Sequence, residues 1–392
     1  MKLTVSKLRV RNFKAIIDSG PVRLSPLTVF IGNNGSGKSS LIEALGLFKR
    51  LAAEDVDEAL AEYRGLAHVR HKQAEQRIEA AKGKILDAKA HQLCLEVSGS
   101  LSVGATGTKR RSPQRYSADV CIAATARGNG VIVATHSVKV GASAPKRGVN
   151  GPAAQHVQSA LRGLCTSWQF LDLEPRRMRE PRDRRLTKRR VLLFPSGSNL
   201  AEYLLEMREG YGEEGRAAFD GLLDAMRQVL PYASDLQPVE RDFLERKVFL
   251  ELTEGTGERG FKVPGWLLST GTLRIAALLA VLRHPEPPPL VCIEEIENGL
   301  DPRTIQLLVS EIQYAVERRG IQVVVTTHSP YFLDLVPLDT VVFVERGEKG
   351  PSFTRPADNA ELRGWAEKFS PGQLYTMNTM TGSGSKAREP KP

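Results

Sequence analysis

The sequence is poor in cysteine and contains no long apolar run. Its 392 residues include four cysteines, and no two of them form a C-x-x-C pair. They are Cys94, Cys121, Cys165 and Cys292. This spacing indicates neither a zinc site nor a disulfide framework, so we expect a reduced, cytoplasmic setting. No stretch approaches the roughly 18 consecutive apolar residues of a membrane span. Residues 1–5 lack the apolar core of a signal peptide. We therefore expect a soluble protein with no membrane partner.

Aromatic residues are absent where positive charge is densest. The net charge is +10 at pH 7, and nine cations fall within residues 176–190 beside only two acids. They are Arg176, Arg177, Arg179, Arg182, Arg184, Arg185, Lys188, Arg189 and Arg190. The lack of interleaved aromatics argues against stacking on nucleic-acid bases. The run can still bind DNA phosphates, with an affinity that falls as salt rises. We predict DNA as a partner of residues 176–190, with an acidic protein partner or a solvated, flexible insertion as the alternatives. A second basic cluster contains Lys109, Arg110, Arg111 and Arg115.

Hydrophobic patterning predicts an α/β architecture. Strands are expected at residues 2–10, 22–24, 27–31, 92–103, 116–126, 131–140, 168–173, 248–252, 290–293, 321–326 and 341–345. Helices are expected at residues 39–50, 200–230, 273–283 and 303–319, with a further helical segment at 51–90. The strand–helix–strand order after residue 290 predicts a parallel sheet that binds ligands at the carboxyl ends of its strands.

A glycine-rich turn joins a strand pattern to a helix pattern near the N-terminus. Residues 32–39 fit G-x-x-x-x-G-K-[ST], the phosphate-binding P-loop. Glycines at such a turn let backbone N–H groups approach phosphates, and the N-terminus of the following helix favours the same anion. Lys38 can reach the β- and γ-phosphates, and the Ser39 hydroxyl can bind Mg²⁺. A purely structural glycine turn is the alternative. We predict an ATP site made by Gly32, Asn33, Asn34, Gly35, Ser36, Gly37, Lys38, Ser39 and Ser40.

An apolar strand that ends in two acids follows in the C-terminal half. Residues 290–293 are Leu-Val-Cys-Ile, and Glu294 and Glu295 come next. A buried strand can deliver carboxylates to the edge of a P-loop site. One of them then holds Mg²⁺ through water and the next polarises the attacking water. The alternative is a strand that ends in two solvated acids. Because the chain also carries a P-loop, we predict the catalytic arrangement, known as Walker B.

A histidine follows the next strand pattern. His328 comes after residues 321–327 and can hydrogen-bond a γ-phosphate and the attacking water. A similar Thr-His-Ser occurs around His136. This second Thr-His-Ser sequence has no proline after it and falls in an antiparallel strand region, so we interpret its similarity to the sequence around His328 as coincidence.

A second anion-binding pattern precedes the two acids. Residues 268–274, Leu-Ser-Thr-Gly-Thr-Leu-Arg, combine a serine, a glycine and a helix start. Since the chain already has its P-loop, we predict that this second cradle serves the nucleotide of a partner subunit. An ordinary helix N-cap at Ser269 or Thr272 is the alternative.

The order of these motifs resembles the ABC-type ATPase head. It runs from the P-loop through the serine–glycine signature and the double acid to Gly-Leu-Asp-Pro at residues 299–302 and Thr-His-Ser-Pro at residues 327–330. Within that class the chain is similar to the SMC/RecF/overcoming-lysogenization-defect branch, whose leading strand matches residues 8–14. Further segments look like the small AAA-type ATPases of this branch, many of which are encoded beside a nuclease or effector in phage-defence loci. These segments are residues 168–175, 197–201 and 293–302.

The resemblance implies a role for individual residues. Glu295 would be the general base, His328 the switch histidine and Asp301 the D-loop acid that contacts the dimer partner. Lys38 and Ser39 would bind phosphate and Mg²⁺.

Further roles concern the metal and the partner subunit. Ser269 and Gly271 would grip the γ-phosphate bound by the opposing subunit, and Glu294 would be a Mg²⁺ ligand. Glu294 stands where the branch often has Asp, and the signature departs from the Ser-Gly-Gly-Gln of transporters. Gln92 is a candidate for the Q-loop glutamine.

The resemblance implies one ATP-binding head of the α/β, P-loop NTPase class. It would have a mixed sheet, an antiparallel β subdomain and a helical lobe. We assign lobe I to about residues 1–50, 91–140 and 290–376, and the helical signature lobe II to residues 196–289. The remaining segments would be a helical insertion at 51–90, a basic insertion at 141–195 and a disordered tail at 377–392.

These features predict an ATPase that forms a homodimer around two ATP–Mg²⁺ groups. It would act as a sensor or motor in DNA repair or anti-phage defence, together with a separately encoded effector or nuclease. We expect no nuclease domain in this chain, because no obvious cluster of metal-binding acids follows His328. The alternative is an ATP-gated scaffold that holds a toxin or nuclease with little turnover. A soluble transporter ATPase is a third, less favoured hypothesis.

Overall fold

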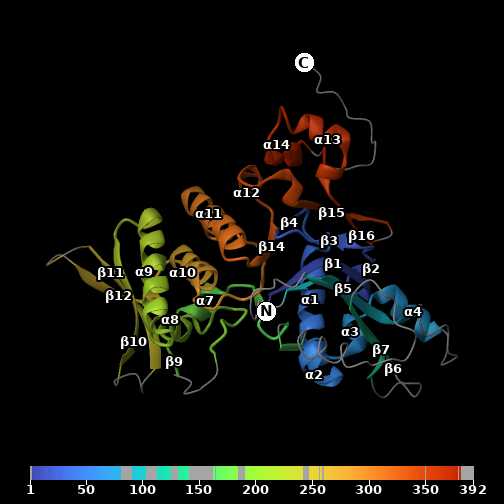
Figure 1. The fold of residues 1–392 in the computed structure, drawn as a ribbon, viewed down its shortest axis with the longest axis horizontal. Coiled ribbons are helices and arrows are strands. Elements are labelled where there is room, and N and C mark those ends of the chain that lie inside the picture. The colour runs from blue at the N-terminus through green and yellow to red at the C-terminus, as the bar shows by residue number, and fades with distance from the viewer. Residues whose placement is uncertain are drawn as a thin grey trace. The chain divides into compact units, whose positions relative to one another are not determined.

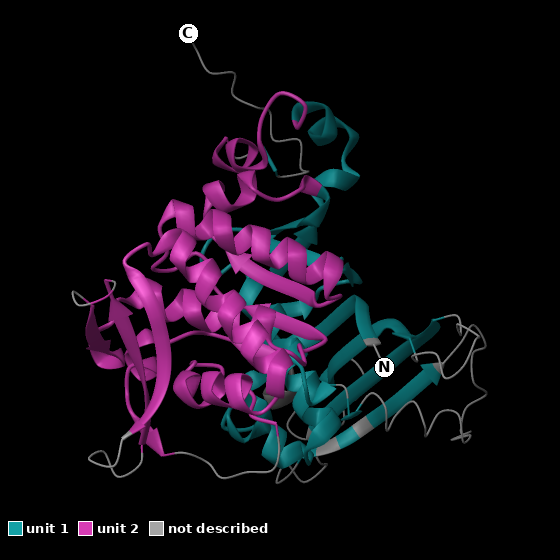
Figure 2. Ribbon diagram, turned by 60° about the vertical axis from the view of Figure 1, so that its left-hand side comes forward, with its two compact units in different colours: residues 1–168, 339–365, 378–392 teal, residues 169–338, 366–377 magenta. Residues whose placement is uncertain are grey.

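The chain folds into two compact units (Figures 1 and 2). Unit 1 comprises residues 1–168, 339–365 and 378–392, and unit 2 comprises residues 169–338 and 366–377. The structure, a computed structural model, describes residues 2–80, 91–102, 113–124, 131–140, 162–163, 165–183, 190–241, 247–255, 257, 260–348, 350–377 and 379–380. Residues 290–338, which the sequence analysis groups with lobe I, lie in unit 2 of this division.

Unit 1 contains an antiparallel sheet built around the long N-terminal strand β1 (Lys2–Phe13). The strand order is β2-β1-β5-β6-β7, and β3 also pairs with β1. The other strands are β2 (Ile16–Asp18), β3 (Val22–Arg23), β5 (Leu93–Ser102), β6 (Gln114–Ala124) and β7 (Val131–Val140). From Leu95 onward, buried and half-buried residues alternate along β5, as expected for a strand with one face toward the core.

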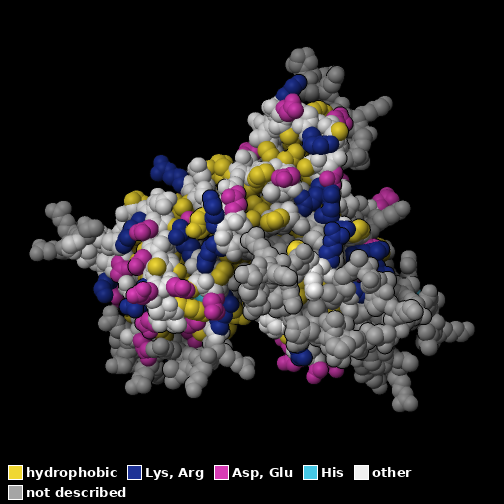
Figure 3. Space-filling model, in the orientation of Figure 1, with side chains coloured by type: hydrophobic (Ala, Val, Ile, Leu, Met, Phe, Trp, Pro, Cys, Tyr) yellow, Lys and Arg dark blue, Asp and Glu magenta, His cyan; other side chains and the backbone are white. Residues whose placement is uncertain are grey.

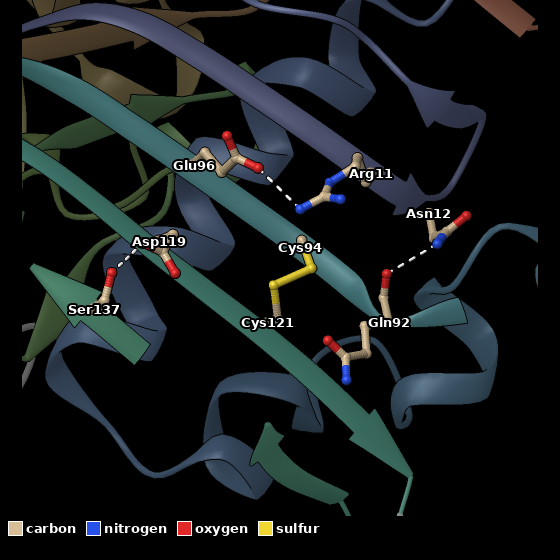
Figure 4. The surroundings of a disulfide bond; sticks show 8 residues. All are labelled: Arg11, Asn12, Gln92, Cys94, Glu96, Asp119, Cys121 and Ser137. Atoms are coloured by element: carbon tan, nitrogen blue, oxygen red, sulfur yellow. Dashed lines mark hydrogen bonds and ion pairs between the residues drawn. A yellow bond between two sulfur atoms is a disulfide. The ribbon is translucent and has the colours of Figure 1, made fainter. Parts of the chain in front are cut away.

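The spacing of the cysteines predicted no disulfide, but the structure contains one. Cys94 on β5 and Cys121 on β6 are direct register partners and are joined by a disulfide (Figure 4). The expectation of no disulfide was wrong. The reason is that 27 residues separate the two cysteines in sequence, and only the pairing of the two strands places them opposite each other. Cys165 and Cys292 are buried and take no part in a disulfide.

A second group of strands in unit 1 carries the P-loop. The fully buried strand β4 (Leu27–Ile31) pairs in parallel with β15 (Val341–Gly347), and β15 pairs antiparallel with β16 (Gly350–Thr354). Helix α1 (Lys38–Ala53) follows the P-loop. The remaining elements are α2 (Val56–Ala61), α3 (Leu66–Val69), α4 (Lys72–Ala80), the 3₁₀ helix Pro356–Asp358 and α13 (Ala360–Trp365), with the 3₁₀ helix Leu338–Thr340 at the unit boundary. Parallel and antiparallel pairs together make the predicted mixed arrangement, which is confirmed.

Unit 2 contains the parallel strands that the sequence predicts after residue 290. Strand β13 (Leu290–Ile293) pairs in parallel with β14 (Gln322–Thr327) on one side and β8 (Gln169–Leu171) on the other. Helix α10 (Thr270–Arg283) is buried from its first turn to Leu282, while α11 (Pro302–Arg318) is amphipathic. Arg283 and Glu311 join the two helices through two hydrogen bonds of 2.8 and 2.6 Å.

The rest of unit 2 is a helical layer with a small antiparallel sheet. The predicted helical region 200–230 breaks at Gly210 and Tyr211 into α8 (Leu200–Glu209) and α9 (Gly212–Val229). The sheet contains β9 (Arg182–Asp183), β10 (Ala233–Arg241), β11 (Lys247–Glu254) and β12 (Phe261–Pro264). Short helices complete the unit: α7 (Pro175–Met178), the 3₁₀ helix Gly265–Leu267, α12 (Pro330–Asp334) and α14 (Pro371–Thr376).

Surface charge on unit 2 is mixed over its helical layer. Figure 3 shows acidic and basic side chains interspersed around α9. None of the described helices combines the length and apolar character that crossing a membrane requires.

Some predicted features fall outside the described residues. They are the cluster Lys109, Arg110 and Arg111, the run members Arg184, Arg185, Lys188 and Arg189, residues 81–90 of the helical insertion, residues 141–161 of the basic insertion, and most of the tail.

Candidate functional site

The P-loop turns sharply between β4 and α1. A Cβ atom on Gly32 would lie 2.0 Å from the carbonyl oxygen of Val344 on the neighbouring strand, so only glycine fits there. Gly35 has a φ of 71°, in the left-handed region that glycine tolerates best. The loop therefore takes a course that few other residues allow.

Polar groups of the loop are arranged to receive an anion. The ammonium of Lys38 is buried and donates to the carbonyls of Gly32 at 2.8 Å and Asn33 at 3.0 Å. The hydroxyl oxygen of Ser36 is buried with no hydrogen-bond partner among the described residues. Gly37 is the N-cap of α1 and offers no side-chain cap, so the helix N-terminus keeps N–H groups that a phosphate can satisfy.

The other polar P-loop residues are more exposed than Lys38 and Ser36. Asn33, Asn34 and Ser39 are exposed and Ser40 is half-buried. The structure adds a cation that the motif does not include. Arg346 on β15 donates to the carbonyl of Gly35 at 3.4 Å. No sequence signal marks Arg346, because it reaches the loop only through strand pairing.

In unit 2 the two acids follow β13 directly. The backbone N–H of Glu294 donates to the carbonyl of Leu171 at 2.9 Å, which continues the β8–β13 pairing. Glu295 has a φ of 45°, a left-handed conformation that costs a non-glycine residue about 1 kcal/mol or more.

Three neighbouring side chains hold Glu295 in this conformation. Its N–H donates to the Thr326 hydroxyl at 2.9 Å, and its carbonyl accepts from the Arg274 guanidinium at 2.9 Å. The Asn298 amide donates to its carboxylate. Strain that the surroundings hold in place is typical of functional sites.

Arg274 comes from the signature helix α10. It is 5% exposed and also donates to the carbonyl of Leu173 at 2.8 Å. Burial lowers the pKa of its guanidinium, and the negative charges of Asp172, Glu295 and Glu297 act in the opposite direction. The sequence analysis did not assign Arg274 a role, since its partner Leu173 lies 101 residues away.

The signature loop packs against the turn that follows the acids. Ser269 is the N-cap of α10, and its hydroxyl accepts the N–H of Thr272 at 3.0 Å. A Cβ atom on Gly271 would lie 2.7 Å from the carbonyl oxygen of Gly299. Ser269 and Thr270 are exposed, so the N-terminal end of the buried helix α10 reaches solvent.

Asp301 lies at the end of this turn, and His328 contacts the turn from the end of β14. His328 follows β14, and its backbone N–H donates to the carboxylate of Glu297 at 2.5 Å. Asp301 caps α11 and accepts hydrogen bonds from the Thr304 hydroxyl at 2.6 Å and the Arg303 N–H at 2.9 Å. Asn298, Thr326 and Glu297 are further site neighbours that the sequence analysis missed.

Each unit thus assembles one part of the predicted residue set. The P-loop residues Gly32 to Ser40 form one cluster in unit 1. Residues Ser269, Gly271, Glu294, Glu295, Asp301 and His328 belong to neighbouring turns of unit 2. Gln92 lies just before β5, where its carbonyl accepts from the Asn12 amide at 2.9 Å, and its Q-loop role stays a prediction (Figure 4). His136 pairs with Val120 in the antiparallel sheet.

Each unit contributes one predicted residue with an oxygen atom of the kind that binds Mg²⁺ together with phosphates. The described residues contain no group of three or more His, Cys, Asp or Glu side chains that could hold a metal by themselves. Mg²⁺ is usually bound through one or two protein oxygens plus phosphates and water. Ser39, at the start of α1, and Glu294, at the end of β13, are oxygen ligands of that kind.

Family models match both parts of the chain. Residues 160–334 match the family described as "AAA domain, putative AbiEii toxin, Type IV TA system", and residues 1–96 match the family described as "AAA ATPase domain". No curated protein sequence matches the chain significantly.

Solved structures share the fold at low sequence identity. The SMC head bound to the C-terminal winged-helix domain of ScpA matches with a TM-score of 0.51 and 14% identity, over 89% of this chain and 97% of that chain. The SMC head with an extended coiled coil, bound to the C-terminal domain of ScpA from Pyrococcus furiosus, matches with a TM-score of 0.52 and 12% identity, over 93% of this chain and all of that chain.

Proposed function

We propose that this chain, which matches AAA family models in two segments and shares the fold of SMC heads, binds ATP with Mg²⁺, dimerises around two such nucleotides and hydrolyses them. In this role it acts as a sensor or motor in anti-phage defence or DNA repair, with a separately encoded effector. The observation that carries the proposal is the left-handed conformation of Glu295, held by Thr326, Arg274 and Asn298. A general base needs such a fixed position relative to the attacking water.

The reaction we propose is the attack of water on the γ-phosphorus of ATP. The Glu295 carboxylate accepts a proton from the water, the new P–O bond forms, and the bond to the β–γ bridging oxygen breaks to give ADP and phosphate. Lys38 and the N–H groups of the P-loop bind the phosphates and stabilise the charge that develops on them. Bound Mg²⁺ would neutralise further phosphate charge, with Ser39 and Glu294 as its protein ligands. His328 would hydrogen-bond the γ-phosphate.

Dimerisation is supported by the surface around the signature loop. Ser269 and Thr270 are exposed, and two large apolar side chains precede them. Trp266 is 41% exposed and Leu267 is 69% exposed. Exposed apolar side chains beside an anion-binding helix N-terminus suit a face that closes on a second nucleotide-bound subunit.

A partner role in defence is supported by the family description that names a putative toxin of a type IV toxin–antitoxin system. The structural neighbours bound to ScpA support a protein partner for heads of this fold.

The test is ATP-dependent dimerisation of the Glu295→Gln variant. It should bind ATP without hydrolysing it and elute from size exclusion as a dimer with ATP and as a monomer without it. Adding Lys38→Ala to this variant should abolish ATP binding and the dimer. Adding Ser269→Arg should abolish the dimer while ATP binding persists. A Glu295→Gln protein that binds ATP and stays monomeric would rule out the proposal.

The second candidate function is an ATP-gated scaffold that hydrolyses little. The departures from the common motifs at Glu294 and in the signature favour it. Phosphate release by the wild-type protein, with and without duplex DNA, separates the candidates. Brisk turnover that depends on Glu295 rejects the scaffold, whereas ATP-dependent dimerisation without turnover supports it.

A further inference from the structure

We propose that Glu297 is a positioning residue, which fixes the backbone of His328 to the turn carrying Glu295 and thereby sets the rate of hydrolysis without contributing to nucleotide binding. This inference rests on the proposed ATPase function and names a residue that the motif pattern leaves without a role.

The first observation is a direct hydrogen bond across 31 residues of sequence. The Glu297 carboxylate accepts the backbone N–H of His328 at 2.5 Å. Hydrogen bonds to an ionised carboxylate are shorter and stronger than neutral ones. His328 is the first residue after β14, where the regular pairing of the strand has ended. The carboxylate therefore binds this peptide at the point where the strand pairing has ended.

The second observation is the environment of the other carboxylate oxygen. Oε2 of Glu297 is buried and has no hydrogen-bond partner among the described residues. A buried carboxylate oxygen without a partner is unfavourable unless a nearby cation compensates for its charge. The guanidinium of Arg274, which also holds the Glu295 carbonyl, interacts electrostatically with Glu297 and provides that charge.

The third observation is that consecutive residues of the turn bind the end of β14. Glu295 donates to the Thr326 hydroxyl at 2.9 Å, and the N–H of Ile296 donates to the Thr326 carbonyl at 3.2 Å. Glu297 then accepts from His328. These three hydrogen bonds thus connect the turn that carries Glu295 to the end of β14 and to His328. Losing the last of these hydrogen bonds weakens the connection between the peptide of His328 and the turn that carries Glu295.

A change of this kind affects the transition state more than binding. Displacing a reacting group by about 1 Å can lower the rate about 100-fold. The nucleotide itself would still be held by the P-loop, which contains none of these residues.

The experiment compares Glu297→Ala with Glu297→Gln. Alanine removes the acceptor for the His328 N–H, whereas glutamine keeps an amide oxygen at the same reach. We expect kcat for ATP hydrolysis to fall about 10- to 100-fold in Glu297→Ala and to recover to within about threefold of wild type in Glu297→Gln. The Kd for a fluorescent ATP analogue should change less than about twofold in both. Glu317→Ala, an exposed acid on α11, is the matched control and should leave both quantities unchanged.

Hydrogen–deuterium exchange tests the contact independently of activity. The amide of His328 should exchange about tenfold faster in Glu297→Ala than in wild type or Glu297→Gln. Wild-type protein without turnover would contradict the proposed ATPase, and the exchange data would still decide whether Glu297 holds His328. Unchanged exchange and unchanged kcat in Glu297→Ala would overturn the inference. So would a loss of kcat that comes with an equal loss of ATP affinity and no recovery in Glu297→Gln.

Discussion

At the scale of single residues, backbone conformation decides where the chain accepts substitution. Glu295 keeps a left-handed conformation because three side chains bind its N–H, its carbonyl and its carboxylate. Most left-handed residues in this structure are glycines, which need no such support. The same local geometry that places Glu295 therefore makes it dependent on Thr326, Arg274 and Asn298.

Two P-loop glycines allow a matched test of this principle. Gly32→Ala should lower the free energy of unfolding by about 3 kcal/mol or more, because its Cβ would lie 2.0 Å from the backbone oxygen of Val344. Gly35→Ala should lower the free energy of unfolding by about 1 kcal/mol. The added Cβ has open space around it, so the only cost is that alanine must adopt the left-handed φ of 71°. Urea denaturation of both variants measures the difference. Equal losses would contradict the role of the close contact at Gly32.

The N-cap of α11 predicts a pH-dependent contribution to stability. Hydrogen bonds from the Thr304 hydroxyl and from the N–H groups of Thr304 and Arg303 hold the pKa of Asp301 below its usual range. A group whose pKa is lowered by folding stabilises the protein above its unfolded-state pKa of about 3.9, and this contribution is lost as the pH falls through the lower folded-state pKa.

The corresponding variant is Asp301→Asn, which keeps a capping oxygen without the charge. Its deficit in unfolding free energy relative to wild type should be about 1 kcal/mol or less above pH 5 and should shrink as the pH falls below 4. Denaturation curves at pH 6, 5, 4 and 3 measure it. A deficit that is the same at every pH would show that the carboxylate charge has no part in the cap.

At the scale of elements, strand pairing creates contacts that neither strand contains alone. Strands β5 and β6 bring Cys94 and Cys121 into register, and the sheet around them is also joined by the Arg11–Glu96 ion pair at 2.9 Å (Figure 4). The signature helix α10 shows the same principle in unit 2. Residues from Thr272 to Leu282 of this helix are buried, and Arg274 in its second turn binds the carbonyl of Glu295.

The strand pair predicts a dependence of stability on redox state. A disulfide that closes a loop of 27 residues contributes about 3 kcal/mol by restricting the unfolded chain. Reductant should therefore lower the unfolding free energy of air-oxidised protein by about that amount. The control is the double variant Cys94→Ala/Cys121→Ala, which should not respond. Thiol labelling after unfolding without reductant should modify Cys165 and Cys292 only; labelling of all four cysteines would refute the pairing.

At the scale of the whole molecule, the positive charge is a local rather than a general property. The described face around α9 mixes both signs (Figure 3). Within the basic run, Arg182 donates to the Ser198 hydroxyl at 2.8 Å and Arg190 donates to the Glu286 carbonyl. These two guanidinium groups therefore already form hydrogen bonds within the chain. Arg176 and Arg177 are exposed on α7, where Arg177 also forms an ion pair with Glu174 at 2.9 Å.

The DNA hypothesis can therefore be tested at two defined side chains. If the run binds duplex DNA, the double variant Arg176→Ala/Arg177→Ala should reduce the slope of log K against log salt concentration by about 2, since each phosphate contact contributes about 0.9. Fluorescence anisotropy with a duplex at several salt concentrations measures the slope. Arg216→Ala on α9 is the control and should not change it. An unaltered slope in the double variant would favour an acidic protein partner or a solvated insertion.

Much of this molecule could be predicted from its sequence because the decisive signals are local. The P-loop is a spacing of glycines and a lysine between a strand and a helix, and backbone sterics impose that spacing wherever a chain makes this turn. The parallel strands β13 and β14 are short apolar runs, whose burial on both faces leaves a simple pattern. The N-cap residue Ser269 is likewise recognised from its immediate neighbours, whereas the cap formed by Asp301 emerged only from the structure.

The tertiary structure decided the contacts that hold these signals in place. Arg274 meets Leu173 across 101 residues, Glu297 meets His328 across 31, and Cys94 meets Cys121 across 27. No local spacing encodes such pairs, because each depends on the register of strands and the packing of a helix that other parts of the chain determine. The sequence by itself determined which groups we propose for binding phosphate and activating water. Only folding determined which side chains keep Glu295 and His328 in position, because a left-handed turn persists only where neighbours distant in sequence bind it.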